Sequence, residues 1–262
     1  MEYMENGSLQ NYLSKEFKNL KWINKIFILY HIIHGLKDIH RQKTVHHDLH
    51  SGNILQGVDF LYITDLGLSI PADKTSSSEN NVLGVLPYVA PEVLKGQSYS
   101  MASDIYSFGV LMSMVSTGKQ PFNLAHDAAL AAKICEGVRP GFSNNTPKIY
   151  IELAYKCMDA DPYKRPTAKE VHETIKYWHL SLNDYYLNKS QEQINEMKST
   201  KKIFLEMDEI KFDPSTITAT LHPEAVYTSR LLKFTGLPQP VNSNKVTIIS
   251  NSDGKCQKIL LY

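Results

Sequence analysis

The sequence predicts a mainly α-helical fold that carries one small β-hairpin. Apolar residues between positions 21 and 41 recur at steps of three and four, the pattern of a helix with one buried face. Residues 101–117 are apolar on nearly every side and predict a helix buried all round in the middle of a helical lobe. Two short apolar runs between positions 54 and 64 are the expected arms of the hairpin.

Composition and charge narrow the class of protein. The chain has 262 residues, of which 42% are apolar, enough for one good-sized core. Its 28 basic and 27 acidic residues give a net charge of +1, so there is no electrostatic case for binding nucleic acid or an anionic membrane. No run approaches the roughly 20 apolar residues that cross a bilayer, and the N-terminal residues lack a secretory signal pattern. Three widely spaced cysteines fit a reducing compartment, so we expect a cytoplasmic protein.

Two helices are expected before the hairpin. Ser8 is a suitable N-cap for a short helix that starts at Leu9, after an Asn-Gly turn signal. The long amphipathic helix, residues 21–41, then leads into a loop. Histidines on or beside this helix are expected to be solvated or capped rather than to bind a metal. They are His31, His34 and His40.

The loop and hairpin that follow carry the candidate chemistry. The stretch VHHDLHSGNILQGVDFLYITDLGL, residues 45–68, places Asp48, Asn53 and Asp65 near two short strand-like arms. Carboxylate and amide oxygens are the ligands that hard divalent cations prefer. Phosphoryl transfer also needs one carboxylate to orient the attacking hydroxyl. These three residues therefore outline a site for phosphate and Mg²⁺.

Zinc is the alternative metal for this stretch. His46, His47 and His50 surround Asp48, and imidazole and carboxylate groups also bind zinc. However, no H-E-x-x-H spacing is present, and the histidines lie in a predicted loop. We therefore favour the phosphate and Mg²⁺ site.

The second half of the chain continues the helical pattern and then changes character. Ser100 is expected to cap the central helix and Gly118 to end it. Further helices are expected at residues 127–136, 147–158 and 167–179. Residues 183–202 are polar and predict a solvated linker or frayed helix. Beyond them, TLHPEAVYTSRLLKF is expected to form a short helix that docks onto a partner or back onto the lobe.

Several motifs, in order along the chain, resemble those of protein kinases. EYMENGSL resembles the hinge between the two kinase lobes, closest to the tyrosine-kinase-like branch. HHDLHSGN resembles the catalytic loop H-R-D-L-x-x-x-N, and DLG resembles D-F-G. PYVAPE resembles the A-P-E that closes the activation loop, which would be the polar residues 71–81. The overall texture resembles kinase-like proteins that are expanded in some fungi.

The resemblance covers residues 1–179 and implies the hinge and C-terminal lobe of a protein kinase domain, a transferase of signal transduction. Residues 180–262 would then be a polar linker and a tail of unknown function, partly disordered. Serine/threonine-type protein substrates are favoured over tyrosine, because the segment HSG lacks the Arg that tyrosine kinases typically carry between the catalytic Asp and Asn.

The resemblance also implies roles around the loop, with ATP and Mg²⁺ as cofactors. Asp48 would orient the substrate hydroxyl, while Asn53 and Asp65 would hold Mg²⁺ on the ATP phosphates. His50 stands where the family has a Lys that steadies the transferred phosphate. Since an exposed imidazole carries only a fraction of a positive charge at neutral pH, stabilisation of the phosphate should suffer.

By the same resemblance, adenine would bind between the hinge and the first hairpin arm. The backbone at Glu2 and Met4 would contact the base, and Leu55 would form the floor of the pocket. Leu66 replaces the Phe of D-F-G and is expected to fill an apolar slot.

Four positions match structural residues of the family. His46 would pack into the interior, and Asp104 would accept hydrogen bonds from the backbone of the catalytic loop. Glu92 is expected to pair with Arg165, because guanidinium binds a carboxylate bidentately.

Two replacements bear on regulation and class. His47 replaces the Arg that in most kinases gathers a phosphate from the activation loop, so phosphorylation within residues 75–78 should change activity little. These residues are Thr75, Ser76, Ser77 and Ser78. Val85 stands where serine/threonine kinases have Thr.

Two hypotheses stay open from the sequence. The first is a protein kinase; since no Gly-rich loop or strand Lys precedes the hinge, this chain should transfer phosphate slowly or not at all, and the working enzyme should have residues upstream of Met1. The alternative is a pseudokinase-like binding module or scaffold without catalysis. A protein substrate and ATP are the expected partners, and the sequence names neither the pathway nor the oligomeric state.

Overall fold

The structure is a computed structural model that describes residues 7–57, 60–71, 82–211 and 221–243, together with the backbone of short strands at 246–248 and 257–259. Within these ranges the helices are α1 (Leu9–Glu16), α2 (Trp22–Arg41), α3 (Pro91–Leu94), α4 (Met101–Thr117), α5 (Ala128–Cys135), α6 (Lys148–Cys157), α7 (Ala168–Leu182) and α8 (Gln191–Asp208). The strands are β1 (Thr44–Val45), β2 (Ile54–Gln56), β3 (Leu61–Ile63), β4 (Ile70–Pro71), β5 (Val82–Gly84), β6 (Arg230–Leu232), β7 (Val246–Ile248) and β8 (Gln257–Ile259). They pair antiparallel in twos, β1 with β4, β2 with β3, β5 with β6 and β7 with β8. The predicted mainly helical fold with a small hairpin is confirmed.

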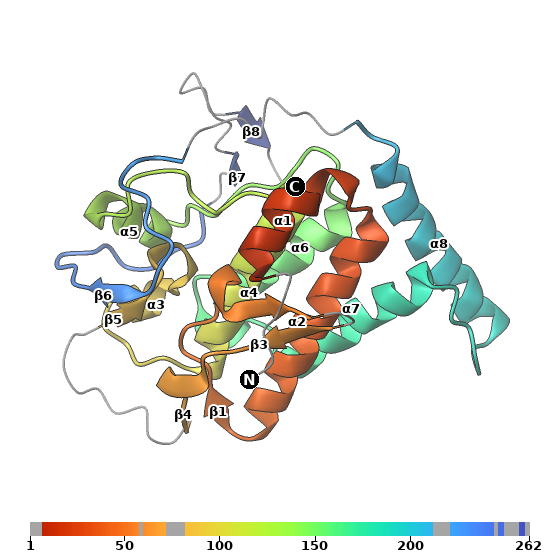
Figure 1. Cartoon of the computed structure of the whole chain (residues 1–262), viewed down its shortest axis with the longest axis horizontal. Coiled ribbons are helices and arrows are strands. Elements are labelled where there is room, and N and C mark those ends of the chain that lie inside the picture. The colour runs from red at the N-terminus through yellow and green to blue at the C-terminus, as the bar shows by residue number, and fades with distance from the viewer. Residues whose placement is uncertain are drawn as a thin grey trace.

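Helix α4 runs through the middle of the helical lobe (Figure 1), where it packs against α2 and α6. It is buried along nearly its whole length. Ser100 caps its N-terminus by accepting a hydrogen bond from the amide of Ser103 at 3.2 Å. Gly118 ends it with a φ of 69°, a left-handed conformation that glycine adopts without strain. Both boundaries agree with the prediction from the sequence.

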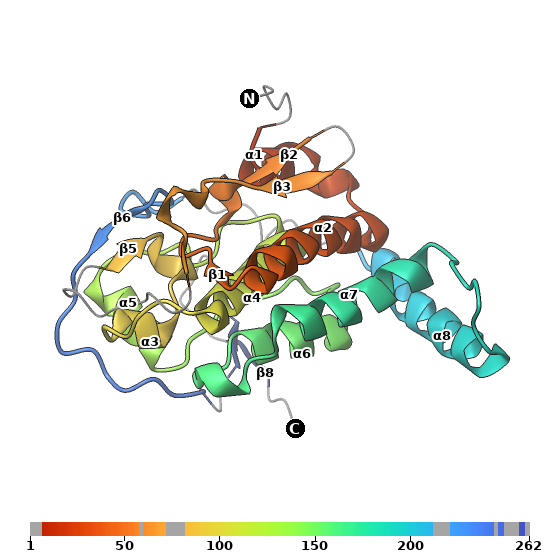
Figure 2. The same cartoon turned by 90° about the horizontal axis from the view of Figure 1, so that it is seen from below.

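Helices α2 and α7 pack against each other, and α8 projects from one end of the pair (Figure 2). The linker or frayed helix expected at residues 183–202 is instead a regular helix from Gln191 onward. Phe204 explains the difference, because its ring is buried between those of Trp22 and Trp178, with centroids 5.8 Å and 5.6 Å away. Helix α8 therefore docks on the core of the lobe through Phe204.

The hairpin of β2 and β3 lies with α1 at one edge of the lobe (Figure 2). Its register pairs Ile54 with Ile63. Helix α1 begins after Ser8, whose hydroxyl accepts a hydrogen bond from the amide of Asn11 at 3.4 Å, as the capping pattern predicts. A bridge between Ser8 and Leu55 ties this helix to the hairpin.

The tail returns to the lobe as a strand rather than as the expected short helix. Strand β6 pairs with β5 so that Leu231 lies opposite Leu83, and Figures 1 and 2 show the two strands side by side near α3 and α5. The pairing satisfies backbone groups at the edge of β5, and it buries Leu232. These long-range contacts outweigh the local helical preference of the segment.

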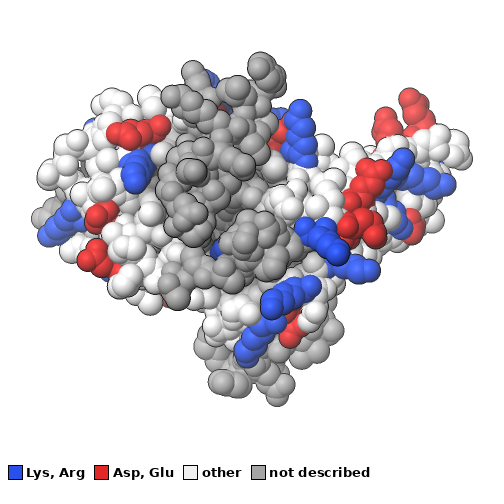
Figure 3. Space-filling view, turned by 90° about the horizontal axis from the view of Figure 1, so that it is seen from above, with Lys and Arg blue, Asp and Glu red and all other residues white. Residues whose placement is uncertain are grey.

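The surface is as balanced in charge as the sequence. Figure 3 shows described Lys, Arg, Asp and Glu side chains interspersed on this face, with both signs on the projecting end where α8 lies. In the part of the chain that the structure describes, no helix is long and apolar enough to cross a membrane.

Candidate active site

Asp104, in the first turn of α4, holds the loop that precedes the hairpin. Its carboxylate accepts hydrogen bonds from the backbone amides of His46 at 2.8 Å and His47 at 3.1 Å. The same carboxylate lies 2.9 Å from Nε2 of His40, near the end of α2. Because Asp104 is only 1% exposed, these charge-assisted bonds act in a low-dielectric environment. The loop is therefore fixed to the central helix.

His46 joins this loop to the hairpin. The side chain is fully buried, with Nε2 3.1 Å from the carbonyl oxygen of Thr64, just beyond β3. Its Nδ1 accepts a hydrogen bond from the amide of Asp48 at 3.3 Å. Asp48 and the end of β3 are thus held by one side chain.

His47 is held in a left-handed conformation, with a φ of 75°. Its ring stacks on Tyr99, with centroids 4.3 Å apart. Burial is the main influence on its pKa and lowers it, so the imidazole is neutral at pH 7. A neutral, stacked ring does not offer the fixed positive charge of the Arg that it replaces.

Asp48 is the centre of the candidate site and is 5% exposed. Nδ2 of Asn53 donates to the backbone carbonyl of Asp48 at 3.0 Å and lies 3.4 Å from its Oδ2. Burial alone would raise the pKa of Asp48, but hydrogen bonds from His50 and from Ser229 of the tail outweigh it and lower the pKa below its ordinary value. The carboxylate is therefore ionised at neutral pH and able to accept a hydrogen bond from a hydroxyl group.

His50 is buried, at 7% exposure, so the expectation of an exposed imidazole is wrong. The ring is covered by the tail, where Oγ of Ser229 lies 3.4 Å from Nε2, and it lies beside Tyr88. Its Nδ1 accepts a hydrogen bond from the amide of Gly52 at 3.1 Å, which leaves the proton on Nε2. Nε2 lies 3.4 Å from Oδ2 of Asp48, so His50 acts as a neutral donor to that carboxylate.

The hairpin brings Asn53 and Asp65 to the same end. Since Ile54 pairs with Ile63, Asn53 lies opposite Thr64, whose amide donates to the carbonyl of Asn53 at 2.9 Å. Asp65 is the next residue, and its φ of 61° and ψ of 55° turn the chain sharply. Its side chain is exposed.

The donors at this end of the hairpin fit a hard divalent cation. Because Nδ2 of Asn53 is directed at Asp48, the amide oxygen Oδ1 is turned away from it, and Asp65 adds carboxylate oxygens. Such oxygen donors suit Mg²⁺ better than a soft metal. Among the described residues, no group of three or more His, Cys, Asp and Glu side chains is placed to hold a metal, so the zinc alternative gains no support.

The adenine side of the site is described only in part. Glu2 and Met4 lie outside the described residues, as do residues 75–78. Leu55 is half-buried in β2. Leu66 is 52% exposed and does not fill the apolar slot expected for it, because it follows the sharp turn at Asp65 in a short 3₁₀ segment at the surface.

Glu92 and Arg165 form a buried, bidentate ion pair. Nη1 of Arg165 donates to Oε1 of Glu92 at 2.7 Å, and Nη2 donates to Oε2 at 2.6 Å. Nη1 also donates to the carbonyl of Ala102 at 2.9 Å. The pair joins the segment after β5 to the start of α4 and to the loop before α7.

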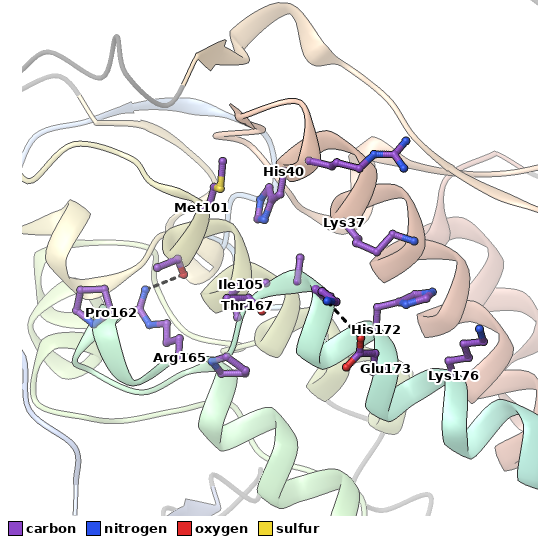
Figure 4. Close-up of a pocket in the computed structure, with 15 residues that line it drawn as sticks. Lys37, His40, Met101, Ile105, Pro162, Arg165, Thr167, His172, Glu173 and Lys176 are labelled. Carbon is purple, nitrogen blue, oxygen red and sulfur yellow. Dashed lines mark hydrogen bonds and ion pairs between the residues drawn. The ribbon is translucent and has the colours of Figure 1, made fainter.

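A cavity of about 760 Å³ lies between α2, α4 and α7. Figure 4 shows His40 and Lys37 from α2 on one side of it, with Arg165 and His172 on the other. None of the candidate residues Asp48, Asn53 or Asp65 lines this cavity, so it is not part of the candidate active site.

Ser229 also belongs to the site, although it was not predicted from the sequence. Ser229, directly before β6, donates a hydrogen bond from Oγ to Oδ2 of Asp48. No local motif marks this serine, because it lies 181 residues from Asp48 in the chain and reaches it only when β6 pairs with β5. The β-prone residues directly before Ser229, which are Val226, Tyr227 and Thr228, were an available signal for a strand.

Comparison with known proteins places these motifs in a family. A family model described as protein tyrosine and serine/threonine kinase matches residues 1–175. A putative serine/threonine-protein kinase/receptor of Acanthamoeba polyphaga mimivirus is 34% identical over 174 residues, which cover 65% of this chain and 10% of the relative. A probable LIM domain-containing serine/threonine-protein kinase of Dictyostelium discoideum is 30% identical, covering 67% of this chain and 27% of the relative. MDIS1-interacting receptor like kinase 2 of Arabidopsis thaliana is 35% identical, covering 63% and 18%. The chain thus spans about a quarter or less of the length of these three relatives.

Proposed function

Because this chain belongs to the protein tyrosine and serine/threonine kinase family, we propose that it transfers phosphate from ATP to serine or threonine hydroxyls of protein substrates, with Mg²⁺ as cofactor. Residues 1–179 would supply the hinge and C-terminal lobe. The observation that carries the proposal is the buried, ionised Asp48, which is fixed by Asn53 and accepts a hydrogen bond from a serine hydroxyl.

In the proposed reaction, Asp48 accepts a hydrogen bond from the attacking hydroxyl and orients it toward the phosphate. Its lowered pKa makes it a weak base, so orientation is its main contribution. Asn53 keeps the carboxylate in place through Nδ2 and, with Asp65, would hold Mg²⁺. When bound, Mg²⁺ neutralises charge on the phosphate oxygens.

We also propose that the transfer is slow. His50 uses its Nε2 hydrogen to bond to Asp48. The family's Lys would instead direct a positively charged ammonium group at the phosphate. His47 is neutral and stacked on Tyr99. Charge stabilisation of the phosphate must therefore come mainly from Mg²⁺ and from residues outside this loop.

Serine/threonine specificity is proposed over tyrosine. The names of the mimivirus and Dictyostelium relatives include serine/threonine-protein kinase, and no Arg stands between Asp48 and Asn53. A cytoplasmic location is proposed because Cys135 and Cys157 are free, buried thiols, as in a reducing compartment.

A pseudokinase-like binding module is the second candidate. The observations that favour it are the neutral histidines at positions 47 and 50 and the exposed Leu66, which leave parts of a full catalytic site unformed. In this reading the surface beside Asp48 binds protein segments without phosphorylating them.

The two candidates differ in a transfer assay with a generic basic protein, Mg²⁺ and ATP. Transfer that is abolished by Asp48→Asn, and kept in the control Asp38→Asn on the exposed side of α2, would support the kinase. Mg²⁺ and ATP together should also raise the thermal midpoint, since a ligand that binds only the folded state stabilises it. Asp65→Asn should reduce this rise without lowering the midpoint of the free protein, because Asp65 is exposed. If Mg²⁺ and ATP do not shift the thermal midpoint and no transfer depends on Asp48, the kinase proposal is wrong and the binding module is supported.

A further inference from the structure

Residues 222–234, hereafter the tail segment, are anchored beside the candidate site. The loop between α4 and α5 holds the first half: the amide of His126 donates to the carbonyl of Glu224 at 3.1 Å. Nδ1 of His126 lies 2.8 Å from the carbonyl of Val226. The hydroxyl of Tyr227 donates to the carbonyl of Pro121 at 3.0 Å, and its ring packs edge-on against His126.

The second half of the tail segment is anchored by pairing with β5. Arg230 lies opposite Gly84, and its Nη2 donates to the carbonyl of His126 at 2.5 Å. Gly84 itself adjoins the site, because a Cβ added to it would lie 3.6 Å from Oδ1 of Asp48. A strand that pairs with β5 therefore lies next to the carboxylate of Asp48.

Ser229 is the tail residue that meets the carboxylate. Its hydroxyl donates to Oδ2 of Asp48, the group proposed to orient an accepting hydroxyl. Residue 229 as a whole is exposed, although its hydroxyl contacts the buried Asp48. Among the described residues, neither neighbouring hydroxyl donates to Asp48: that of Tyr227 donates to the carbonyl of Pro121, and Thr228 is exposed.

We propose that the surface along the edge of β5 and Asp48, hereafter the groove, receives the acceptor segment of a protein substrate, that the tail segment occupies it, and that Ser229 is itself a phosphate acceptor. This inference rests on the proposed function. Strand pairing with β5 supplies sequence-independent affinity, as when an extended peptide adds to a sheet edge. The groove thus fits an extended segment with a short hydroxyl side chain followed by a basic residue.

The reaction needs a nucleoside triphosphate with Mg²⁺ as co-reactant. A bond forms between Oγ of Ser229 and the γ-phosphorus, and the bond from that phosphorus to the β,γ-bridging oxygen breaks. The nucleoside diphosphate leaves with the electron pair of the broken bond. The proton of the hydroxyl passes to Asp48 and then to solvent.

Occupation of the groove also excludes other substrates until the tail segment leaves. Phosphorylated Ser229 would place a dianion against the ionised Asp48, and like charges at this distance repel. Modification should therefore release the tail segment and free the groove for another acceptor.

Whether the tail segment occupies the groove can be tested without catalysis, in the full chain, by comparing Ser229→Glu with the matched control Thr228→Glu. Hydrogen exchange of the amides of residues 82–84 should be at least about tenfold faster in Ser229→Glu, as in local opening, and unchanged in Thr228→Glu. A labelled peptide with the sequence EAVYTSRLLKF should bind Ser229→Glu about tenfold or more tightly than the wild type, because the groove is vacated. Equal exchange and equal peptide binding in the two variants would overturn occupation. An unchanged circular-dichroism spectrum shows that each variant is folded, and Arg230→Ala, which removes the bond to His126, gives a second route to release.

The acceptor role is tested by mapping phosphate after incubation of the full chain with Mg²⁺ and ATP. Phosphate on Ser229 at a rate independent of protein concentration, lost in Ser229→Ala and kept in Thr228→Ala, would support it. Phosphorylation of a generic basic protein that depends on Asp48, with Ser229 unmodified, would overturn the acceptor role and leave the proposed function standing. No transfer to either acceptor would overturn both, while hydrogen exchange would still decide whether the groove is occupied.

Discussion

The carboxylate of Asp104 contacts the loop before the hairpin at two backbone amides, and Asp104→Ala tests how much these contacts stabilise the fold. The change leaves the amides of His46 and His47, and Nε2 of His40, without an acceptor in a site that is 1% exposed. A hydrogen bond to a charged group contributes about 1.5–3 kcal/mol, and removing one member of a buried charged network costs about 3–5 kcal/mol. We expect the free energy of unfolding to fall by about 4 kcal/mol, which lowers Tm by about 8–16 °C for a domain of this size.

Denaturant unfolding followed by circular dichroism measures this loss, with two variants for comparison. Asp104→Asn keeps the shape of the side chain and one acceptor oxygen, so it should lower the free energy of unfolding by about half as much as Asp104→Ala. Asp38→Ala removes an exposed carboxylate whose ion pairs with Lys37 and Arg41 are 3.7 Å and 3.8 Å long, and it should cost less than about 1 kcal/mol. If Asp104→Ala is no more destabilising than Asp38→Ala, the argument that Asp104 fixes the loop is wrong.

Three further substitutions probe the packing of the lobe. Glu92→Ala leaves the buried guanidinium of Arg165 without its carboxylate and should destabilise by about 3–5 kcal/mol in the same assay, whereas the double alanine variant should lose less than the sum of the single changes. Phe204→Ala should cost about 3–5 kcal/mol and exposed Leu205→Ala less than about 1 kcal/mol; equal costs would show that α8 is not part of the core. Burial, followed by the charge of a nearby lysine, lowers the pKa of His172 to about 4. In the unfolded chain His172 is protonated below about pH 6.5, whereas in the folded chain it is protonated only below about pH 4. The free energy of unfolding therefore falls as the pH drops through this window. Since the ring lines a solvent-accessible cavity, we expect His172 to contribute about 1 kcal/mol to the loss of stability between pH 7 and pH 5, so His172→Gln should lose about 1 kcal/mol less than the wild type.

Local signals predicted the parts of the fold that depend on local interactions. Helix α4 has a capping serine, an all-apolar sequence and a terminal glycine, and each signal acts within a few residues. The hairpin of β2 and β3 follows equally from two short apolar arms joined by a brief connection. The order of the motifs also placed Asp48 and Asn53 together, and in the structure Nδ2 of Asn53 contacts Asp48.

Long-range contacts decided the parts that the sequence did not predict. His50 was expected to be exposed, yet the tail covers it through Ser229, which is 179 residues away in the chain. The segment around Leu232 was expected to be helical, and pairing with β5 made it a strand. Helix α8 was read as a polar linker because only Phe204 and Met197 among its residues are buried. These two buried side chains dock a helix whose other residues are mostly polar or charged, and composition alone does not reveal them.

The edge of β5 has a consequence for association between molecules. A strand with free backbone groups on one side is a template for pairing with another chain, and in this protein β6 covers that side. When the tail segment of one molecule leaves, the identical strand of a second molecule fits the same edge in the same register, which is the geometry of a domain swap. A reciprocal exchange would place Ser229 of each protomer beside Asp48 of the other, so at high protein concentration the proposed transfer would become intermolecular and its rate would depend on concentration. Release of the strand in an isolated molecule would instead leave an open edge that other extended segments can join.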